Sequence, residues 1–371
     1  MKFTISTRPL KNVTNLGIIK ANISQFYERS ELLQIVATRD TLQLNLEAAG
    51  IKTKMTLKGS GDSDSVAAIL VECAKFKQLI DSIDTEIMTL EFIPGGLSVH
   101  AGTSKFSIAQ LADINDMQLD EPISEYTASS TVAIPAASWQ FVKDHQIFAL
   151  ATSDKRPVYQ NVWVGDDHGV IAGDMDIGMF AYSKQGSFDK SCLLPASIIN
   201  LFTSIPEGST VSRVGNNYVL NIETDSYSMI TEFTPKYEED SAVGSYNADM
   251  ILKILNHPES FITIDIAPII KFINQTSIVN QAGRDKLFTL TVADHTLTLT
   301  NRVSSYSMDV DTDDSYTVIF ATEYIKKVLA NLDSDNVNIA PMIQQTSTGG
   351  TRVVGCIFWT EKLTLVLAGQ G

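Results

Sequence analysis

Few residues in this sequence have the types and spacing that metal binding would need. The densest run of carboxylates is Asp309, Asp311, Asp313 and Asp314, which resembles the beginning of a calcium loop. A calcium loop needs glycine at its sixth position and glutamate at its twelfth. Asp314 and Phe320 stand at those positions. We therefore expect an acidic turn after a strand, and no metal site.

The motifs of phosphate-binding and hydrolytic enzymes are also missing. The glycine- and serine-rich segment 59–64 lacks the Gly-Lys-Ser/Thr ending of a phosphate loop, which favours a surface loop. No Gly-x-Ser-x-Gly elbow occurs. The five histidines are scattered, without the paired spacing of zinc ligands. The sequence therefore predicts a protein with no catalytic residues and no cofactor.

The composition indicates the class of protein. The chain has 371 residues, of which 44% are hydrophobic and 19% charged, so it can bury a sizeable core. No apolar run approaches the ~18 residues of a membrane helix, and the N-terminus has no signal-peptide core. Three cysteines, Cys73, Cys192 and Cys356, are too few for a disulfide framework. We expect a cytoplasmic protein that does not associate with membranes.

The basic side chains are concentrated on six segments with helical spacing of apolar residues. With short flanks these segments hold 14 of the 28 basic side chains but only 9 of the 43 acidic ones, although the chain has a net charge of −15. They are residues 7–29, 72–83, 136–156, 195–205, 265–286 and 322–333. A surface lined by such helices could attract the phosphates of nucleic acid without reading its sequence. Alternatively, lysine and arginine accumulate there because they are good helix formers.

The elements that would position these residues recur three times. An alternating strand followed by a helix begins at residues 3, 132 and 262, about 130 residues apart. Each copy continues with alternating strands, a second helix and more strands. The second helices are residues 73–83, 195–205 and 322–332.

This recurrence predicts an α+β fold made of three tandem repeats, each with two helices and two small antiparallel sheets. The expected domains are residues 1–125, 126–247 and 248–371, separated by polar segments. Three units of this size agree with typical domain lengths of roughly 100–200 residues.

The triple repeat and three fragments resemble the bacterial DNA polymerase sliding clamp, the β subunit of DNA polymerase III. The fragments are MKFTI at residues 1–5, GTSKFSI at 102–108 and FALATSDKRPVY at 148–159. The resemblance spans the whole chain. It implies a non-enzymatic processivity factor, in which two crescent-shaped subunits close into a ring around duplex DNA. It also implies contacts with DNA that do not depend on sequence.

The resemblance places seven basic residues toward the central hole or its rim, where they would contact phosphates loosely. They are Lys20, Arg29, Lys75, Lys155, Arg156, Arg284 and Lys286. Tight base-reading contacts would work against sliding.

The resemblance also implies a homodimer that closes between the first repeat of one subunit and the third repeat of the other. Phe106 and Ile108 would lie on the pairing strand, and the end of a helix near Ile278 and Val279 would receive them. Such pairing would cover an exposed strand edge. Alternatively, Phe106 and Ile108 are ordinary inward-facing strand residues.

Sliding clamps hold polymerases and clamp loaders through short peptides in an apolar groove between the second and third repeats. The corresponding lining here would be Met175, Ile177, Met179, Val366 and Leu367. Methionine adapts to varied peptides, although it is also a common core filler.

The chain departs from the family pattern in three places. The loop expected to border the peptide site reads GDMDIG at residues 173–178, the C-terminal segment reads LAGQG at 367–371, and segment 195–205 has no basic residue. Such departures suggest a virus-encoded or otherwise specialised clamp. The alternative from a different class is an α+β repeat protein that binds a ligand or hydrolyses a substrate between its domains.

Overall fold

The computed structural model describes most of the chain in segments separated by gaps. These are residues 1–15, 32–48, 51–111, 119, 122, 127–128, 130–133, 136–152, 155–165, 169–184, 187–188, 192–196, 199, 207–234, 246–279, 286–347 and 349–370. The chain divides into two compact units. Unit 1 comprises Met1–Trp139, Ser187–Asp189 and Asn200–Glu239, and unit 2 comprises Gln140–Gly186, Lys190–Ile199 and Asp240–Gly371.

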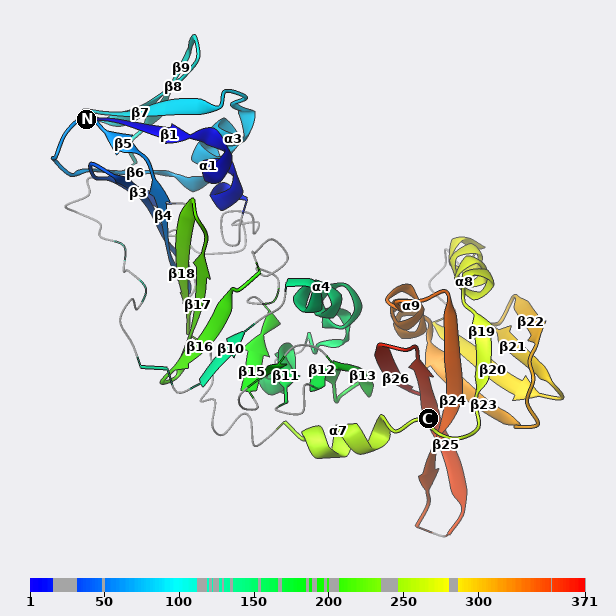
Figure 1. Cartoon of the computed structure of the whole chain (residues 1–371). Coiled ribbons are helices and arrows are strands. Elements are labelled where there is room, and N and C mark those ends of the chain that lie inside the picture. The colour runs from blue at the N-terminus through cyan, green and yellow to red at the C-terminus, as the bar shows by residue number, and fades with distance from the viewer. Residues whose placement is uncertain are drawn as a thin grey trace. The chain divides into compact units, whose positions relative to one another are not determined.

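Unit 1 begins with an antiparallel sheet of five strands (Figure 1). In spatial order they are β5 (Ser60–Gly61), β1 (Lys2–Ser6), β7 (Ile87–Ile93), β8 (Gly96–Ala101) and β9 (Ser104–Ala109). Phe3 and Ile5 of β1 are buried while Thr4 between them is exposed, as the alternation in the sequence predicts. The strand β9 forms an open edge of this sheet.

The second sheet of unit 1 has nine strands. They are β14 (Ser187–Phe188), β10 (Ser130–Ala133), β16 (Thr210–Val214), β17 (Asn217–Glu223), β18 (Tyr227–Phe233), β4 (Ile51–Lys58), β3 (Thr41–Ala48), β2 (Leu32–Ala37) and β6 (Ala67–Glu72). The strands β18 and β4 pair antiparallel, from Tyr227 opposite Leu57 to Phe233 opposite Ile51. This pairing joins residues that lie far apart in the sequence.

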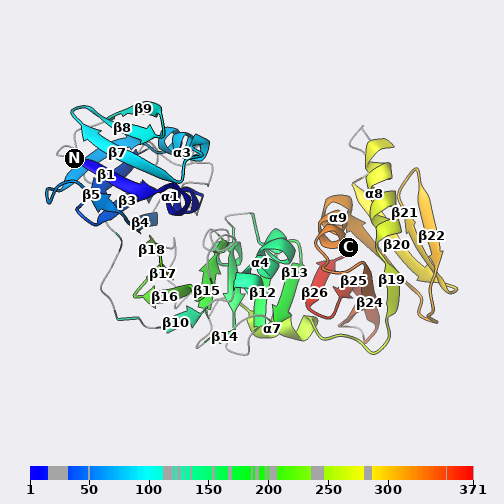
Figure 2. The same cartoon turned by 45° about the horizontal axis from the view of Figure 1, so that its top comes forward.

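Two helices of unit 1 lie beside one another, as both views show (Figures 1 and 2). They are α1 (Thr7–Thr14) and α3 (Cys73–Ser82). In α3 the side chains of Cys73, Phe76 and Ile80 are buried, which is the apolar spacing that predicts this helix. Of the predicted helical segment 7–29, the structure describes α1, and residues 16–31 lie outside the described residues.

Unit 2 contains the other two antiparallel sheets. The larger has eight strands: β15 (Cys192–Pro195), β11 (Asn161–Val164), β12 (Gly169–Asp174), β13 (Met179–Lys184), β26 (Leu363–Ala368), β25 (Thr351–Trp359), β24 (Asn336–Gln345) and β19 (Ile262–Asp265). The smaller has β22 (Ser305–Asp309), β21 (Thr296–Thr300), β20 (Leu287–Ala293) and β23 (Tyr316–Ala321). The strands β13 and β26 pair from Met179 opposite Leu367 to Ser183 opposite Leu363.

The remaining helices are α4 (Ala136–His145), α7 (Ala248–Ile254), α8 (Ala267–Val279) and α9 (Thr322–Ala330), with short 3₁₀ helices η3 (Ile147–Ala149) and η4 (Pro157–Gln160). The helices α8 and α9 pack together (Figures 1 and 2). The helix α9 buries Ile325, Val328 and Leu329, as its apolar spacing predicts. Pro195 of the predicted segment 195–205 ends β15, and most of that segment lies outside the described residues.

The strand order recurs along the chain. One strand order is common to three groups: β5-β1-β7-β8-β9, β14-β10-β16-β17-β18 and β19-β24-β25-β26. A second strand order is common to three other groups: β6-β2-β3-β4, β15-β11-β12-β13 and β23-β20-β21-β22. The predicted mixture of helices and antiparallel sheets is confirmed. The division into three domains stays a prediction, because two of the sheets continue across the predicted boundaries. None of the described helices is long and apolar enough to cross a membrane.

Candidate functional site

A cavity of about 990 Å³ opens on unit 2 where three parts of the chain meet. They are the loop between β12 and β13, the beginning of β20 with the first turn of α9, and the segment that follows β26. The lining residues are Met175, Asp176, Ile177, Gly178, Lys286, Leu287, Ala321, Thr322, Glu323, Tyr324, Lys326, Ala368, Gly369 and Gln370. We call this cavity the groove.

The loop of residues 175–178, which we call the groove loop, is fixed at both ends. Asp174 pairs with Met179 in the sheet, and its Oδ1 accepts a hydrogen bond of 2.9 Å from the backbone N–H of Asp176. The carbonyl of Gly178 accepts a hydrogen bond of 2.9 Å from the N–H of Ala368. Gly178 has a φ of +64°, a conformation that glycine adopts without strain. The loop therefore presents Met175 and Ile177 to the groove from a fixed base.

The opposite wall is formed by the end of β23 and the beginning of α9. Tyr324 is half-buried there, and Leu287 at the beginning of β20 is 50% exposed. Burial and the nearby carboxylates of Glu323 and Asp174 raise the pKa of Tyr324, so its hydroxyl remains protonated at neutral pH. The groove thus combines apolar walls with a tyrosine hydroxyl that lies beside the carboxylate of Glu323.

Charged groups of both signs border the groove. Lys286, Lys326 and Glu323 are exposed and line it. Arg156, which precedes η4, forms an ion pair of 3.2 Å between its Nε and Oδ1 of Asp176. This pair brings a residue of the predicted DNA-binding set to the groove loop.

The residues predicted to line a peptide groove fall into two groups. Met175 and Ile177 line the cavity. Met179, Val366 and Leu367 are each 1% exposed and belong to the paired strands β13 and β26 behind it. Their packing fixes the strands from which the groove loop and the segment after β26 emerge.

The sequence reasoning missed the wall contributed by β20 and α9. Leu287 and Tyr324 were not singled out, and Lys286 was assigned to DNA. The available signal was the amphipathic spacing of residues 322–332, which leaves the ring of Tyr324 off the buried face of the helix. Which surface that ring would join depends on the pairing of β13 with β26, and no local pattern reveals this pairing.

The open strand β9 in unit 1 carries the residues predicted to form a subunit junction. Phe106 is 39% exposed, and Ile108 is buried. Both line a cavity of about 320 Å³ together with Lys75, Leu79 and Leu111. Of the predicted receiving residues, Ile278 and Val279 lie in α8, and the structure describes only their backbone.

The remaining residues of the predicted DNA-binding set are placed as follows. Lys75 is exposed on α3 and forms an ion pair of 2.5 Å with Glu72. Lys155 is exposed beside Arg156. Lys20, Arg29 and Arg284 lie outside the described residues.

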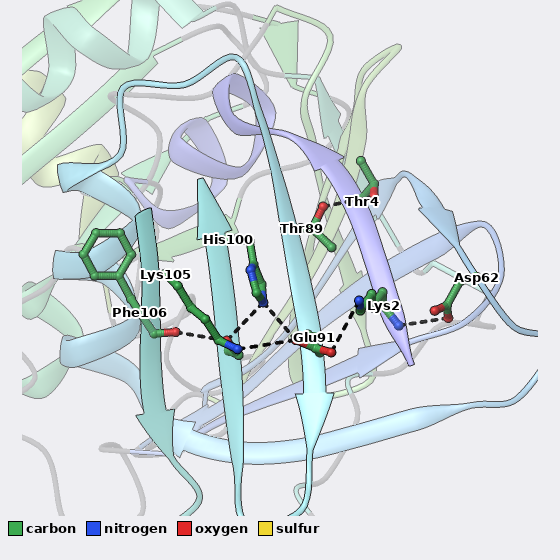
Figure 3. A network of polar contacts seen from close by, with 9 residues as sticks. Lys2, Thr4, Asp62, Thr89, Glu91, His100, Lys105 and Phe106 are labelled. Carbon is green, nitrogen blue, oxygen red and sulfur yellow. Dashed lines mark hydrogen bonds and ion pairs between the residues drawn. The ribbon is translucent and has the colours of Figure 1, made fainter. Parts of the chain in front are cut away.

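A polar network crosses the exposed face of the five-stranded sheet (Figure 3). Glu91 lies 2.9 Å from Nε2 of His100, 3.6 Å from Nζ of Lys2 and 4.0 Å from Nζ of Lys105. The hydrogen bond with His100 and the charges of the two lysines lower the pKa of Glu91. The network therefore links the strands β1, β7, β8 and β9 through one carboxylate.

The acidic run is placed as the sequence predicts, in a turn. Asp309 ends β22, and Asp311, Asp313 and Asp314 follow it in the loop before β23. Oδ2 of Asp314 accepts a hydrogen bond from the hydroxyl of Ser260. Within the described ranges, no three histidine, cysteine, aspartate or glutamate side chains converge in a way that could hold a metal ion.

No protein-family model and no curated protein matches this chain by sequence. Solved structures match it over its whole length. The DNA polymerase sliding clamp of Bacillus subtilis is 15% identical with a TM-score of 0.73, covering 100% of this chain and 99% of its own. The DNA polymerase III beta subunit of Thermotoga maritima is 14% identical with a TM-score of 0.76 and the same coverage. The beta clamp of Helicobacter pylori, solved bound to a DNA ligase peptide, is 15% identical with a TM-score of 0.68, covering 100% of both chains.

This chain has the fold of the bacterial sliding clamp. The likeness extends from one end of the chain to the other, so all four sheets of the two units take part in it. The sliding-clamp fold therefore accounts for the strand order that recurs along the chain.

Proposed function

We propose that the protein is a DNA sliding clamp, a non-enzymatic processivity factor that encircles duplex DNA as a homodimer. The observation that carries this proposal is the likeness to sliding clamps over the whole chain, at TM-scores of 0.73 and 0.76. The proposed domains are residues 1–125, 126–247 and 248–371.

The sheet order supports closure into a ring. Within unit 1 the last strand of one repeat, β18, pairs with β4 of the preceding repeat. Within unit 2, β26 pairs with β13 in the same way. The equivalent strands that remain are β9 and β22, and each forms an open edge of its sheet. Pairing β9 of one copy with β22 of another would repeat the same junction and cover these two edges.

The side chains at these edges suit such a junction. Phe106 exposes more than a third of its surface on β9 although its ring is apolar. In our proposal it packs with Ile108 against the end of α8 of the other copy, near Ile278 and Val279. Two copies would form two such junctions, so the ring would close without further subunits.

The proposed DNA contacts are made by cations carried on helices and their flanks. The candidates for these phosphate contacts remain Lys20, Arg29, Lys75, Lys155, Arg156, Arg284 and Lys286. Contacts of exposed lysine and arginine with phosphate do not depend on base sequence and weaken with salt. Such contacts suit a protein that must move along DNA.

The groove is the proposed docking site for polymerase and clamp-loader peptides. Its volume of about 990 Å³ is within the usual range for a ligand site, and its walls combine Met175, Ile177, Leu287 and Tyr324. Methionine and isoleucine on a short loop can adapt to different apolar side chains. The beta clamp of H. pylori binds a DNA ligase peptide.

The mass of the protein in solution tests ring closure. Light scattering over a concentration series should give twice the 40.6 kDa of one chain. A mass of one chain at every concentration would contradict the proposed homodimer. The alternative, a repeat protein with a ligand site, would then need to be considered.

A further inference from the structure

We propose that Arg156 positions the peptide groove by holding the groove loop through Asp176. This inference rests on the proposed peptide-binding function. It assigns to Arg156 a role in addition to the phosphate contact that the resemblance implies. Its starting point is the 3.2 Å ion pair between Nε of Arg156 and Oδ1 of Asp176.

The backbone of Arg156 is held in place from its C-terminal side. Its carbonyl accepts a hydrogen bond of 3.0 Å from the N–H of Tyr159. Tyr159 is buried, and the centroid of its ring lies 4.8 Å from the centroid of the Tyr246 ring. The side-chain amide of Asn161 donates a hydrogen bond of 3.0 Å to the carbonyl of Pro157, which fixes the same turn. The guanidinium therefore extends from an anchored backbone.

The groove loop is anchored at its two ends, and Asp176 lies at its tip. The backbone hydrogen bonds at Asp174 and Gly178 restrain the ends. Met175 and Ile177, which form one wall of the groove, flank Asp176 directly. An ion pair at Asp176 therefore restrains the part of the loop that carries the apolar wall.

The exposure of the pair sets the size of its effect. The side chain of Arg156 is 53% exposed and that of Asp176 is 33% exposed, so solvent screens the attraction. Removing an exposed ion pair changes the equilibrium constant of the process that depends on it by about two- to fivefold. Reversing one charge also adds repulsion between the two side chains to the lost attraction. We therefore expect about a tenfold effect of charge reversal on peptide affinity.

A charge-swap cycle tests the proposal. The probe is the H. pylori DNA ligase peptide labelled with fluorescein, and the readout is fluorescence anisotropy. Arg156→Glu and Asp176→Arg should each weaken binding about tenfold, and the chain carrying both changes should recover to within about threefold of the unmodified protein. The matched control is Lys184→Glu, which makes the same change of charge on an exposed residue at the far end of β13. It should leave the affinity unchanged.

Methyl NMR supplies a readout that needs no peptide. The methyl signals of Met175 and Ile177 should shift in Arg156→Glu, return toward their original positions in the swapped chain and stay in place in Lys184→Glu. A residue that only contacts DNA would leave these signals and the peptide affinity unchanged.

The outcomes separate this inference from the proposed function. If the unmodified protein binds the peptide and Arg156→Glu binds it equally well, the positioning role is refuted and the groove stands. Failure of the swapped chain to recover would also refute the role, because the effect would not act through Asp176. If the unmodified protein does not bind the peptide, the proposed groove fails, and the inference fails with it.

Discussion

Replacing Phe106 with arginine should open the proposed ring. Phe106 lies on β9, the open edge of the five-stranded sheet, and lines a cavity with Ile108 and Leu111. Its exposed ring is the surface that a second copy would bury. The substitution places a charge at that position without altering the interior of unit 1.

The expected magnitude follows from burial and charge. Full burial of a phenylalanine contributes about 1.5–3 kcal/mol. Phe106 keeps 39% of its surface exposed in one chain, so its share of junction burial is about 1 kcal/mol. Burying an unpaired guanidinium costs about 2 kcal/mol more. Two junctions in each ring give about 6 kcal/mol, or roughly a 10⁴-fold increase in the dissociation constant.

Sedimentation velocity over a dilution series measures this change. The matched control is Ile93→Arg, because Ile93 is also 39% exposed and lies at the end of β7 in the same sheet. The control should remain a dimer, while Phe106→Arg should sediment as a single chain with unchanged circular dichroism. A Phe106→Arg protein that stays dimeric at the concentrations where the unmodified protein is dimeric would refute the junction.

Three further predictions concern the groove and the polar network. Gly178→Ala should lower the free energy of unfolding, measured by urea titration, by about 2 kcal/mol. The φ of Gly178 is positive, and an added Cβ would lie 2.5 Å from the Cβ of Ala368. Unchanged stability would contradict the strain expected at this position. Tyr324→Ala should weaken binding of the H. pylori ligase peptide about tenfold and leave the dimer intact, whereas equal affinity would remove α9 from the groove. Glu91 has its pKa lowered from 4.5, chiefly by its hydrogen bond with His100, so its stabilising contribution is complete above that value and is lost as pH falls through the lowered pKa. Thermal stability should therefore fall less steeply with decreasing pH in Glu91→Gln than in the unmodified protein. Parallel curves of stability against pH would contradict the pairing of Glu91 with His100.

The helices were predictable where apolar spacing is strong. The predicted segments 73–83 and 322–332 are observed as Cys73–Ser82 and Thr322–Ala330. Each buries residues one turn apart on one face, which is a local property of the sequence. The strands that begin the three predicted repeats were found for the same reason, because their alternation needs only a few residues.

The long sheets were not predictable from such patterns. The pairing of β18 with β4 joins Tyr227 to Leu57, and no turn connects the two strands. Edge strands pair through backbone hydrogen bonds, which any extended segment can form. The sequence therefore predicted repeats but did not indicate that two sheets would cross the predicted boundaries.

The site was predicted in part for a related reason. Met175 and Ile177 were found through the resemblance, and the structure places them on the groove. Lys286 and Arg156 were assigned to DNA through the same resemblance, as cations that could contact phosphate. The structure places Lys286 on the groove wall and pairs Arg156 with Asp176. Charge alone does not indicate which surface a side chain joins; the fold decides it.

Retention on DNA whose ends can be blocked tests the central claim most directly. Fluorescent protein is threaded at high concentration onto a linear duplex blocked at one end by biotin and streptavidin. The second end is then either blocked with an antibody or left free, and the sample is diluted at moderate salt. A sliding clamp should remain on the doubly blocked duplex and be lost from the free end, and it should not enter a duplex blocked at both ends beforehand. Equal retention on all three duplexes would show side-on binding and contradict encirclement.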